Sequence, residues 1–211
     1  MDIKAVFFDL DDTLYDHKEY EFFLYEKISE MVGRFFKVSS SDYYSALRKY
    51  FNKRHQVPIF DVAFADLDCA AKTPRRAWHE FVAKEVLPFY RSASPSKLAL
   101  FHWVEECFIY LQERNITLGL ITDGRVEMQK KKIALLGIAD FFSHILISDE
   151  FGYEFRKPNI FMFKRAIALT GAKPQNMIYV GNDLIKDKAS EQTGIAFIEH
   201  IHFPKYYRDL I

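Results

Sequence analysis

Five short apolar runs constrain this chain more than any other feature of its sequence. They are rich in Val, Ile, Leu and Phe, and most end in Asp, Asn, Gly or Ser; they span residues 4–10, 118–122, 144–148, 177–181 and 195–199. Runs this short and apolar are typical of strands buried on both faces of a parallel sheet. Segments with helical spacing, 126–136, 160–169 and 185–192, separate the last four runs. This alternation predicts an α/β fold with helices on both faces of the sheet.

More than a hundred residues separate the first run from the second. No single crossover between parallel strands needs so many residues, so we expect an inserted subdomain over residues 17–94. Residues 19–36, 41–51 and 75–90 have helical periodicity and few strand signals, which predicts a helical insert. The pattern of residues 96–114 then predicts one long helix that connects the insert back to the sheet. The core is expected to comprise residues 1–16 and 95–211.

Charge and hydropathy exclude several classes of protein. The chain has 29 Lys and Arg and 29 Asp and Glu residues, so bulk charge does not favour a nucleic acid polymer or a membrane surface as partner. We interpret the run Lys130 to Lys132 as the solvated face of a helix. No apolar run approaches the roughly 18 residues of a membrane span. Cys69 and Cys107 are isolated, which favours a reducing compartment and a cytoplasmic protein.

The first run ends in two carboxylates, Asp9 and Asp11, within the sequence FDLDDT. Side chains two residues apart on a strand point the same way, so both carboxylates are expected at the carboxyl edge of the sheet, where open α/β sheets bind ligands. Like charges this close need a cation, for which Mg²⁺ fits best, or a proton on one carboxyl. A proton on Asp11 would make it a general acid. The alternative is a solvated acidic turn.

Two further motifs follow the predicted strands. Thr122 ends the second run in ITDG, and its hydroxyl with the N–H groups of the turn at Asp123 can hold a phosphoryl oxygen. The alternative is an ordinary turn in which either residue caps the next helix. Lys157 precedes Pro158 and can offset carboxylate and phosphate charge, although a lone Lys is more often at the surface.

The fourth motif, VGND, is followed by Asp187. An acid at the end of this strand can complete a metal site with Asp9. The alternative is a helix N-cap at Asn182 or Asp183. Taken singly, most of these motifs are weak. Together they are stronger, because all four would converge on one edge of one sheet.

In these residues the chain resembles the haloacid dehalogenase superfamily. DLDDT, ITDG, KP and VGND…D match that family's motif order, over residues 1–16 and about 100–200. The resemblance implies a Rossmann-like doubly wound parallel sheet core with an inserted helical cap subdomain. It also implies an Mg²⁺-dependent phosphatase that acts on a small phosphorylated metabolite. The sequence leaves open whether the protein is a monomer or a homodimer.

The resemblance also implies roles for individual residues. Asp9 would be the nucleophile that forms an aspartyl phosphate, and Asp11 would protonate the leaving oxygen and then activate water. Thr122, Asp123 and Lys157 would bind the phosphoryl group. Asp9, the backbone carbonyl of Asp11 and an acid of the fourth motif would hold Mg²⁺. Thr13 and Asp187 are expected to support the site.

The fourth motif departs from the family pattern, because Asn182 stands where many members have Asp next to Gly. We favour Asp183 as the metal ligand, with Asn182 as the alternative. An Asn ligand would weaken the site, which supports a second hypothesis of a catalytically impaired binding or regulatory protein. A third hypothesis, a 2-haloacid dehalogenase, is disfavoured by Asp11, because halide leaves without a proton.

Overall fold

The computed structural model describes residues 2–54 and 56–210. The chain divides into two compact units. Met1–His17 and Lys97–Ile211 form the first, which we call the core unit, and Lys18–Ser96 form the second, which we call the insert unit. Each unit has its own cluster of buried apolar side chains.

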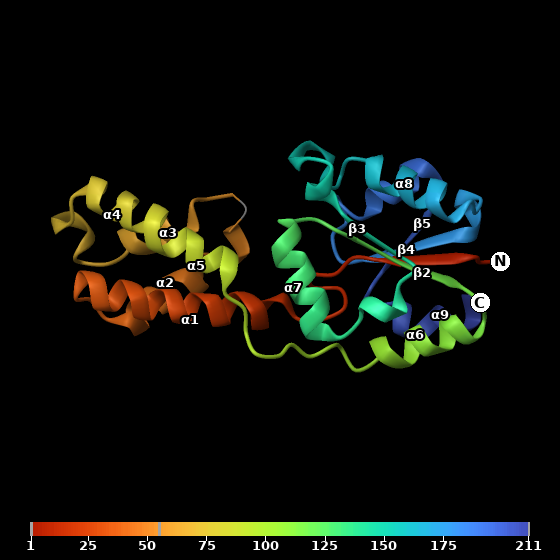
Figure 1. Cartoon of the computed structure of the whole chain (residues 1–211), viewed down its shortest axis with the longest axis horizontal. Coiled ribbons are helices and arrows are strands. Elements are labelled where there is room, and N and C mark those ends of the chain that lie inside the picture. Colours follow the sequence, from red (N-terminus) through yellow and green to blue (C-terminus); the bar gives the residue numbers. More distant parts are fainter. Residues whose placement is uncertain (1, 55, 211) are drawn as a thin grey trace. The chain divides into compact units, whose positions relative to one another are not determined.

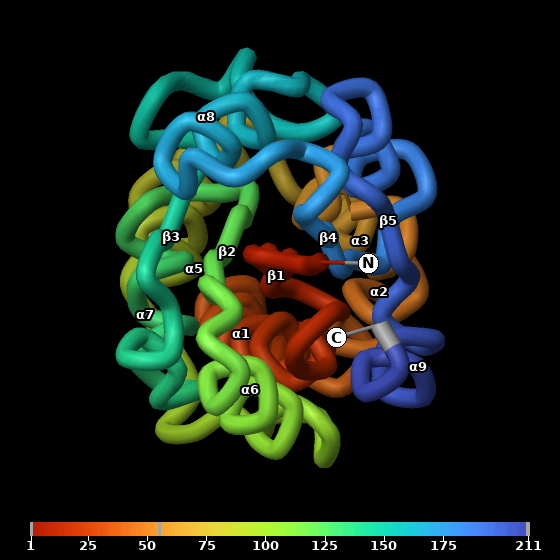
Figure 2. Tube along the Cα trace, turned by 90° about the vertical axis from the view of Figure 1, so that its right-hand side faces the viewer, coloured from red at the N-terminus to blue at the C-terminus, as the bar shows by residue number. Residues whose placement is uncertain are grey.

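Among the described residues, the strands of the core unit form one five-stranded sheet with the order β3-β2-β1-β4-β5, and each neighbouring pair is parallel. The strands are β1 (Ala5–Phe8), β2 (Thr117–Thr122), β3 (His144–Ile147), β4 (Met177–Gly181) and β5 (Ala196–Glu199). Helix α8 (Phe161–Thr170) covers one face, whereas α6 (Val104–Glu113) and α9 (Phe203–Leu210) cover the other (Figures 1 and 2). The α/β fold class expected from the apolar runs is confirmed.

The central strand β1 is buried on both faces, as its uninterrupted apolar sequence predicts. Its side chains alternate between the two layers: Phe7 belongs to the cluster that includes Phe163 of α8, and Phe8 packs edge-on against Phe108 of α6. Gly119 of β2 lies opposite Phe7, and a Cβ there would lie 2.1 Å from the Phe7 ring. Glycine is therefore required at this position so that the Phe7 ring can lie across β2.

Two helices of the core unit differ from the sequence-based expectation. The helix expected over 96–114 is wrong at its start, because α6 begins at Val104. Leu100 instead bridges to Tyr15, and the N–H of Phe101 donates to the carbonyl of Leu14 at 2.9 Å. The segment before α6 thus uses its backbone groups to bind the chain that follows β1. Helix α7 (Val126–Leu136) has the expected bounds and ends at Gly137, which has a positive φ of 66°.

The helix expected over 185–192 is also wrong. A 3-10 segment covers Lys188–Thr193 instead, and the residues before it form a turn. The Asp183 carboxylate accepts hydrogen bonds from the N–H groups of Ile185 and Lys186 at 2.8 and 2.9 Å. Such local side-chain bonds compete with regular helix for the same backbone groups.

The insert unit is helical, as its periodicity predicts. Its helices are α1 (His17–Phe36, of which residue 17 belongs to the core unit), α2 (Ser40–Tyr50), α3 (Ile59–Ala65), α4 (Arg75–Phe81) and α5 (Leu87–Ser92). At its centre the Trp78 ring stacks on Phe64 with a centroid distance of 3.8 Å. A π-helical turn, Val82–Val86, joins α4 to α5. Pro88 follows this turn and lacks the N–H that a continuous helix would use there.

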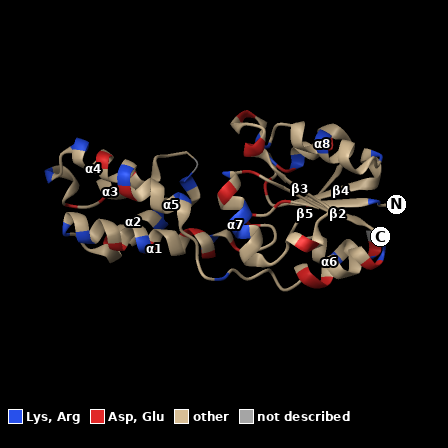
Figure 3. Ribbon diagram, viewed as in Figure 1, with Lys and Arg blue, Asp and Glu red and all other residues tan. Residues whose placement is uncertain are grey.

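Acidic and basic side chains are interspersed over the helices of both units (Figure 3). This distribution agrees with the equal numbers of acids and bases in the sequence. Within the described residues, no helix combines the length and the apolar character that crossing a membrane requires.

Candidate active site

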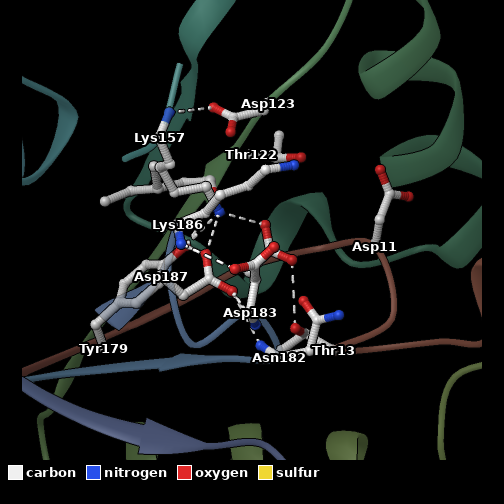
Figure 4. Close-up of polar contacts among 12 residues, drawn as sticks. Asp11, Thr13, Thr122, Asp123, Lys157, Tyr179, Asn182, Asp183, Lys186 and Asp187 are labelled. Carbon is white, nitrogen blue, oxygen red and sulfur yellow. Dashed lines mark hydrogen bonds and ion pairs between the residues drawn. The ribbon is translucent and has the colours of Figure 1, made fainter. Parts of the chain in front are cut away.

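The strand order brings the sequence motifs to one edge of the core sheet. β1 lies between β2 and β4, so the residues that follow these three strands are neighbours. Asp9 directly follows β1, and its N–H donates to the carbonyl of Val180 in β4 at 2.8 Å. Thr122 is the last residue of β2. Figure 4 shows the side chains of Lys157, Tyr179 and Asp187 gathered at this edge.

Lys157 is the centre of the buried polar cluster. Its ammonium contacts Oδ1 of Asp9 and Oδ1 of Asp187, both at 2.6 Å, and the hydroxyl of Tyr179 at 2.9 Å. The side chain of Lys157 is 3% exposed, so the interpretation of a surface Lys is excluded. A buried ammonium requires partners of opposite charge, and both carboxylates supply them.

One buried cation thus lies between two buried acids. Burial raises the pKa of Asp9 to about 7; Lys157 opposes this shift, and the neighbouring Asp187 adds to it. Burial alone would lower the pKa of Lys157, but Asp187 and Asp9 outweigh burial and raise that pKa well above its usual value. Lys157 is therefore charged, and the cluster holds more potential negative than positive charge when both acids are ionised.

The backbone of Lys157 is held by the turn after β2. Its N–H donates to Oδ1 of Asp123 at 3.2 Å. The preceding residue, Arg156, makes two hydrogen bonds of 2.6 Å to the Asp149 carboxylate and lies over the Tyr153 ring. The side chain of Asp123 therefore helps to place Lys157, and its proposed part in phosphate binding stays a prediction.

The fourth motif is organised by Asp187, which is 1% exposed. Its Oδ2 accepts hydrogen bonds from the N–H groups of Asn182 and Asp183 at 2.9 and 3.0 Å, while its Oδ1 contacts Lys157. A Cβ at Gly181 would lie 2.4 Å from the Asp187 carboxylate, so only glycine leaves room for this carboxylate beside β4. Asp187, expected to be supporting, thus connects the turn after β4 to the buried Lys157.

Asp183 and Asn182 remain the alternatives for the metal. Asn182 is exposed, and Asp183 is partly buried. Burial by itself would raise the pKa of Asp183, but hydrogen bonds from the N–H groups of Lys186 and Ile185 outweigh it and lower that pKa. An ionised oxygen ligand is available at Asp183, whereas Asn182 offers only a neutral amide.

Asp11 has a separate set of partners from Asp9. Its carboxylate contacts the ammonium of Lys132 through both oxygens at 2.9 Å, Nδ1 of His17 at 3.0 Å and the hydroxyl of Tyr15 at 2.5 Å. Figure 4 shows the Asp11 carboxylate apart from the cluster of Lys157, Tyr179 and Asp187. The side chains of Asp9 and Asp11 therefore do not lie as expected, because the two carboxylates do not share one cation or one proton.

The environment of Asp11 favours its ionised form. Burial would raise the pKa of Asp11, but the charges of His17 and Lys132, with hydrogen bonds from His17 and Tyr15, hold that pKa well below its usual range. Asp9 and Asp11 thus differ in their environments: the pKa of the first is raised and that of the second is lowered.

Sequence reasoning missed Lys132 and Gln129. The interpretation of Lys130 to Lys132 as a solvated face is wrong for Lys132, whose side chain is 4% exposed. The signal was present in the spacing, because Lys132 follows Met128 by four residues and precedes Leu136 by four. These positions share one helix face, and all of them are buried. A charged residue within an apolar stripe indicates a buried ion pair.

The donors at this edge suit a hard divalent cation in their chemistry. Among residues 2–54 and 56–210, no three His, Cys, Asp or Glu side chains are grouped closely enough to hold a metal as they lie. Oδ1 of Asp9 contacts Lys157, and its Oδ2 accepts a hydrogen bond from Thr13 at 3.3 Å. Oδ1 of Asp183 accepts a hydrogen bond from the backbone. The carboxylate oxygens nevertheless follow the adjacent strands β1 and β4, and oxygen ligands are those that Mg²⁺ prefers.

A family model described as haloacid dehalogenase-like hydrolase matches residues 6–199. The chain belongs to this family. Among its relatives, the glyceraldehyde 3-phosphate phosphatase of Methanopyrus kandleri is 33% identical over 203 residues, covering 93% of this chain and 83% of the relative. The protein of the same name from Methanothermobacter thermautotrophicus is 30% identical, covering 88% and 79%. The predicted family and the predicted enzyme class, a phosphoric monoester hydrolase, are confirmed.

Solved structures agree on the fold of this haloacid dehalogenase-like hydrolase. A phosphatase of this family from Thermococcus onnurineus has a TM-score of 0.63 at 20% identity, covering 92% of this chain and 85% of that one. A 2-haloacid dehalogenase from Pseudomonas syringae has a TM-score of 0.60 at 20% identity, covering 99% and 100%. These two structures show the fold, whereas the enzyme class rests on the phosphatases named above.

Proposed function

We propose that this protein is an Mg²⁺-dependent phosphatase that hydrolyses a small phosphorylated metabolite through a phosphorylated Asp9. The observation that supports it most is the buried contact of Asp9 with Lys157 beside Thr122. A carboxylate nucleophile needs a nearby cation, because the transferring phosphoryl group brings more negative charge to the site. The Lys157 ammonium lies 2.6 Å from Asp9 and supplies that charge.

The reaction proceeds in two steps in this proposal. An oxygen of Asp9 forms a bond to phosphorus while the ester P–O bond breaks. Asp11, whose surroundings favour its ionised form, first takes up a proton from solvent and then donates that proton to the leaving oxygen. A water oxygen then forms a bond to phosphorus, the Asp9–phosphorus bond breaks, and Asp11 accepts the proton of the water. Thr122 and Lys157 hold the phosphoryl oxygens during both steps. The ionised Asp11 described above is the form that the second step requires.

Asp9, the backbone carbonyl of Asp11 and Asp183 are proposed to hold Mg²⁺, with Asn182 as the alternative to Asp183. When bound, the ion neutralises phosphoryl charge and orients the ester for attack. The remaining contributions come from the chain itself. Thr13 hydrogen-bonds to Asp9 at 3.3 Å, and Asp187 contacts the Lys157 ammonium at 2.6 Å.

Hydrolysis of p-nitrophenyl phosphate at neutral pH tests this function. We expect nitrophenol release with millimolar Mg²⁺ and little release after treatment with EDTA, because the metal compensates phosphoryl charge. Activity that persists at the full rate in EDTA would contradict the metal requirement. Release of halide from a 2-haloacid, without release of phosphate from any ester, would favour the dehalogenase instead.

The names of the relatives make glyceraldehyde 3-phosphate the first natural substrate to test. Phosphate release from it should exceed release from unrelated sugar phosphates and nucleoside monophosphates at equal concentration. Equal rates for all of them would indicate a broad phosphatase rather than one for a three-carbon substrate.

Replacement of Asp11 by Asn is expected to slow turnover by about a hundredfold or more, because general acid–base help is lost in both steps. The variant should be less stable than the wild type, because the buried Lys132 ammonium loses the charge of Asp11, although Asn can still accept hydrogen bonds from Tyr15 and Lys132. Steady-state kinetics on p-nitrophenyl phosphate measure the effect, with the melting temperature as a control for folding. An unchanged rate would remove Asp11 from the mechanism.

A further inference from the structure

Helix α7 places two buried polar side chains, Gln129 and Lys132, beside the acid–base carboxylate. The two residues are one turn apart, and they are 2% and 3% exposed. Buried polar residues on a helix face are rare without a partner. Here both have Asp11 as partner, and Gln129 has Thr122 as well.

Gln129 joins two residues that have different roles in the proposed reaction. Its amide nitrogen lies 3.2 Å from Oδ2 of Asp11 and 2.5 Å from Oγ1 of Thr122. Because the Lys132 ammonium donates to both oxygens of Asp11, this carboxylate acts as an acceptor, and the NH₂ of Gln129, not its oxygen, faces it. One N–H then points to Asp11 and the other to Thr122.

This assignment fixes what the Thr122 hydroxyl can do. Because its oxygen accepts from Gln129, its own proton is available for another acceptor. A phosphoryl oxygen at the sheet edge is such an acceptor. Gln129 thus directs the Thr122 hydroxyl to donate to the phosphoryl group and, through its second N–H, sets the position of Asp11 relative to that hydroxyl.

Gly124 leaves the space that Gln129 needs. Its φ is +139°, which favours glycine, and a Cβ at this position would lie 3.2 Å from the amide carbon of Gln129. The glycine of the ITDG motif therefore serves the turn and also leaves Gln129 free to reach Thr122. This relation was not visible in the sequence alone.

Lys132 determines the orientation of Asp11. Its ammonium is 2.9 Å from each carboxylate oxygen, which prevents rotation of the carboxylate without loss of a charged contact. Tyr15 and His17 face the same carboxylate from the segment after β1. Asp11 is therefore held from two sides, by α7 and by its own loop.

We propose that Gln129 and Lys132 are positioning residues, which align Asp11 and Thr122 with each other for phosphoryl transfer. They act through these two side chains and do not touch the reacting atoms. The inference rests on the proposed function, because it assumes that Asp11 acts as acid and base. It goes further by assigning a task in the reaction to two residues of α7.

A double-mutant cycle between Lys132→Met and Asp11→Asn tests the proposal. On p-nitrophenyl phosphate, Lys132→Met should lower kcat by about tenfold to a hundredfold and change KM by less than about twofold. In the Asp11→Asn background, the same substitution should lower kcat by less than about twofold, because its target is already lost. Lys132→Arg should recover part of the rate by restoring the charge.

Two further variants provide controls. Lys130→Met removes an exposed lysine of the same helix and should leave kcat unchanged. Gln129→Met should lower kcat as Lys132→Met does, and it serves as the second test if Lys132→Met does not fold. Thermal melts of all variants separate loss of folded protein from loss of rate.

The possible outcomes distinguish the inference from the proposed function. If Asp11→Asn itself keeps the wild-type rate, the proposed role of Asp11 fails. If Asp11→Asn is slow but Lys132→Met and Gln129→Met keep or exceed the wild-type kcat, only the positioning role fails. An equal loss from Lys132→Met in both backgrounds would also overturn that role, because Lys132 would then act independently of Asp11.

Discussion

Substitution of Asp9 by Asn should reduce turnover by about four orders of magnitude or more, which is comparable to the loss of nucleophiles in other enzymes that form covalent intermediates. An amide oxygen is a poor nucleophile toward phosphorus and does not provide the charge that a metal ligand supplies. Assays under single-turnover conditions, with phosphate detection, measure the residual rate. Transfer of labelled phosphate to the wild-type protein, and not to the variant, would link the loss to the proposed intermediate.

The fold of the Asp9→Asn variant should persist. Lys157 keeps its contact with Asp187 at 2.6 Å, so the buried ammonium is still neutralised, and the amide oxygen can accept in place of Oδ1. Glu127→Gln, on the exposed surface of α7, is a matched control for the loss of one negative charge. A wild-type rate in Asp9→Asn would show that the nucleophile assignment is wrong.

Substitution of Lys157 by Met should affect both stability and activity. The change leaves the Asp9 and Asp187 carboxylates buried without their common cation. Removing one partner from a buried ionic cluster typically costs about 3–5 kcal/mol of the free energy of unfolding. Activity should fall by about a thousandfold, because the cation that stabilises phosphoryl charge is lost. Urea unfolding and steady-state kinetics measure the two effects separately.

A double variant separates these two effects. Lys157→Met combined with Asp187→Asn removes one of the two unpaired carboxylates, so part of the stability should return while activity stays low. Lys164→Met, at an exposed position of α8, is the matched control and should change neither quantity. If Lys157→Met were as stable as the wild type, the buried ionic cluster would not have the energetic importance inferred here.

The sheet was the part of the fold that sequence reasoning predicted best. A strand buried on both faces requires apolar residues at every position, and β1, with all four side chains buried, satisfies that requirement. The errors fell where a local side-chain bond or a distant backbone pairing occupies the backbone groups that a helix would use. Asp183 bonds to Ile185 and Lys186, and residues near Leu100 bond to the chain near Tyr15, so regular helix does not form in either segment.

The candidate site was predictable only in part, for a related reason. Whether a residue follows a strand can be read from the neighbouring sequence, so Asp9, Thr122 and Asp183 could be assigned to one edge of the sheet. Partners across the sheet are not encoded locally. The contacts between Lys157 and Asp187 and between Lys132 and Asp11 join residues 30 and 121 positions apart. No short motif expresses such a pair, although the charged residue within the apolar stripe of α7 indicated one of them.

The central place of β1 in the sheet has a consequence for how the protein folds. Ala5 of β1 pairs with Thr117 of β2 and with Met177 of β4, so every ladder made by this strand joins distant segments. Loop closure over such separations slows folding, whereas the most extensive helix contacts within residues 18–96, such as those between α2 and α3, join segments that are close in sequence. The insert unit can therefore become ordered while β1 is still unpaired. Asp9, which directly follows β1, reaches its final surroundings only when β1 has paired with both β2 and β4.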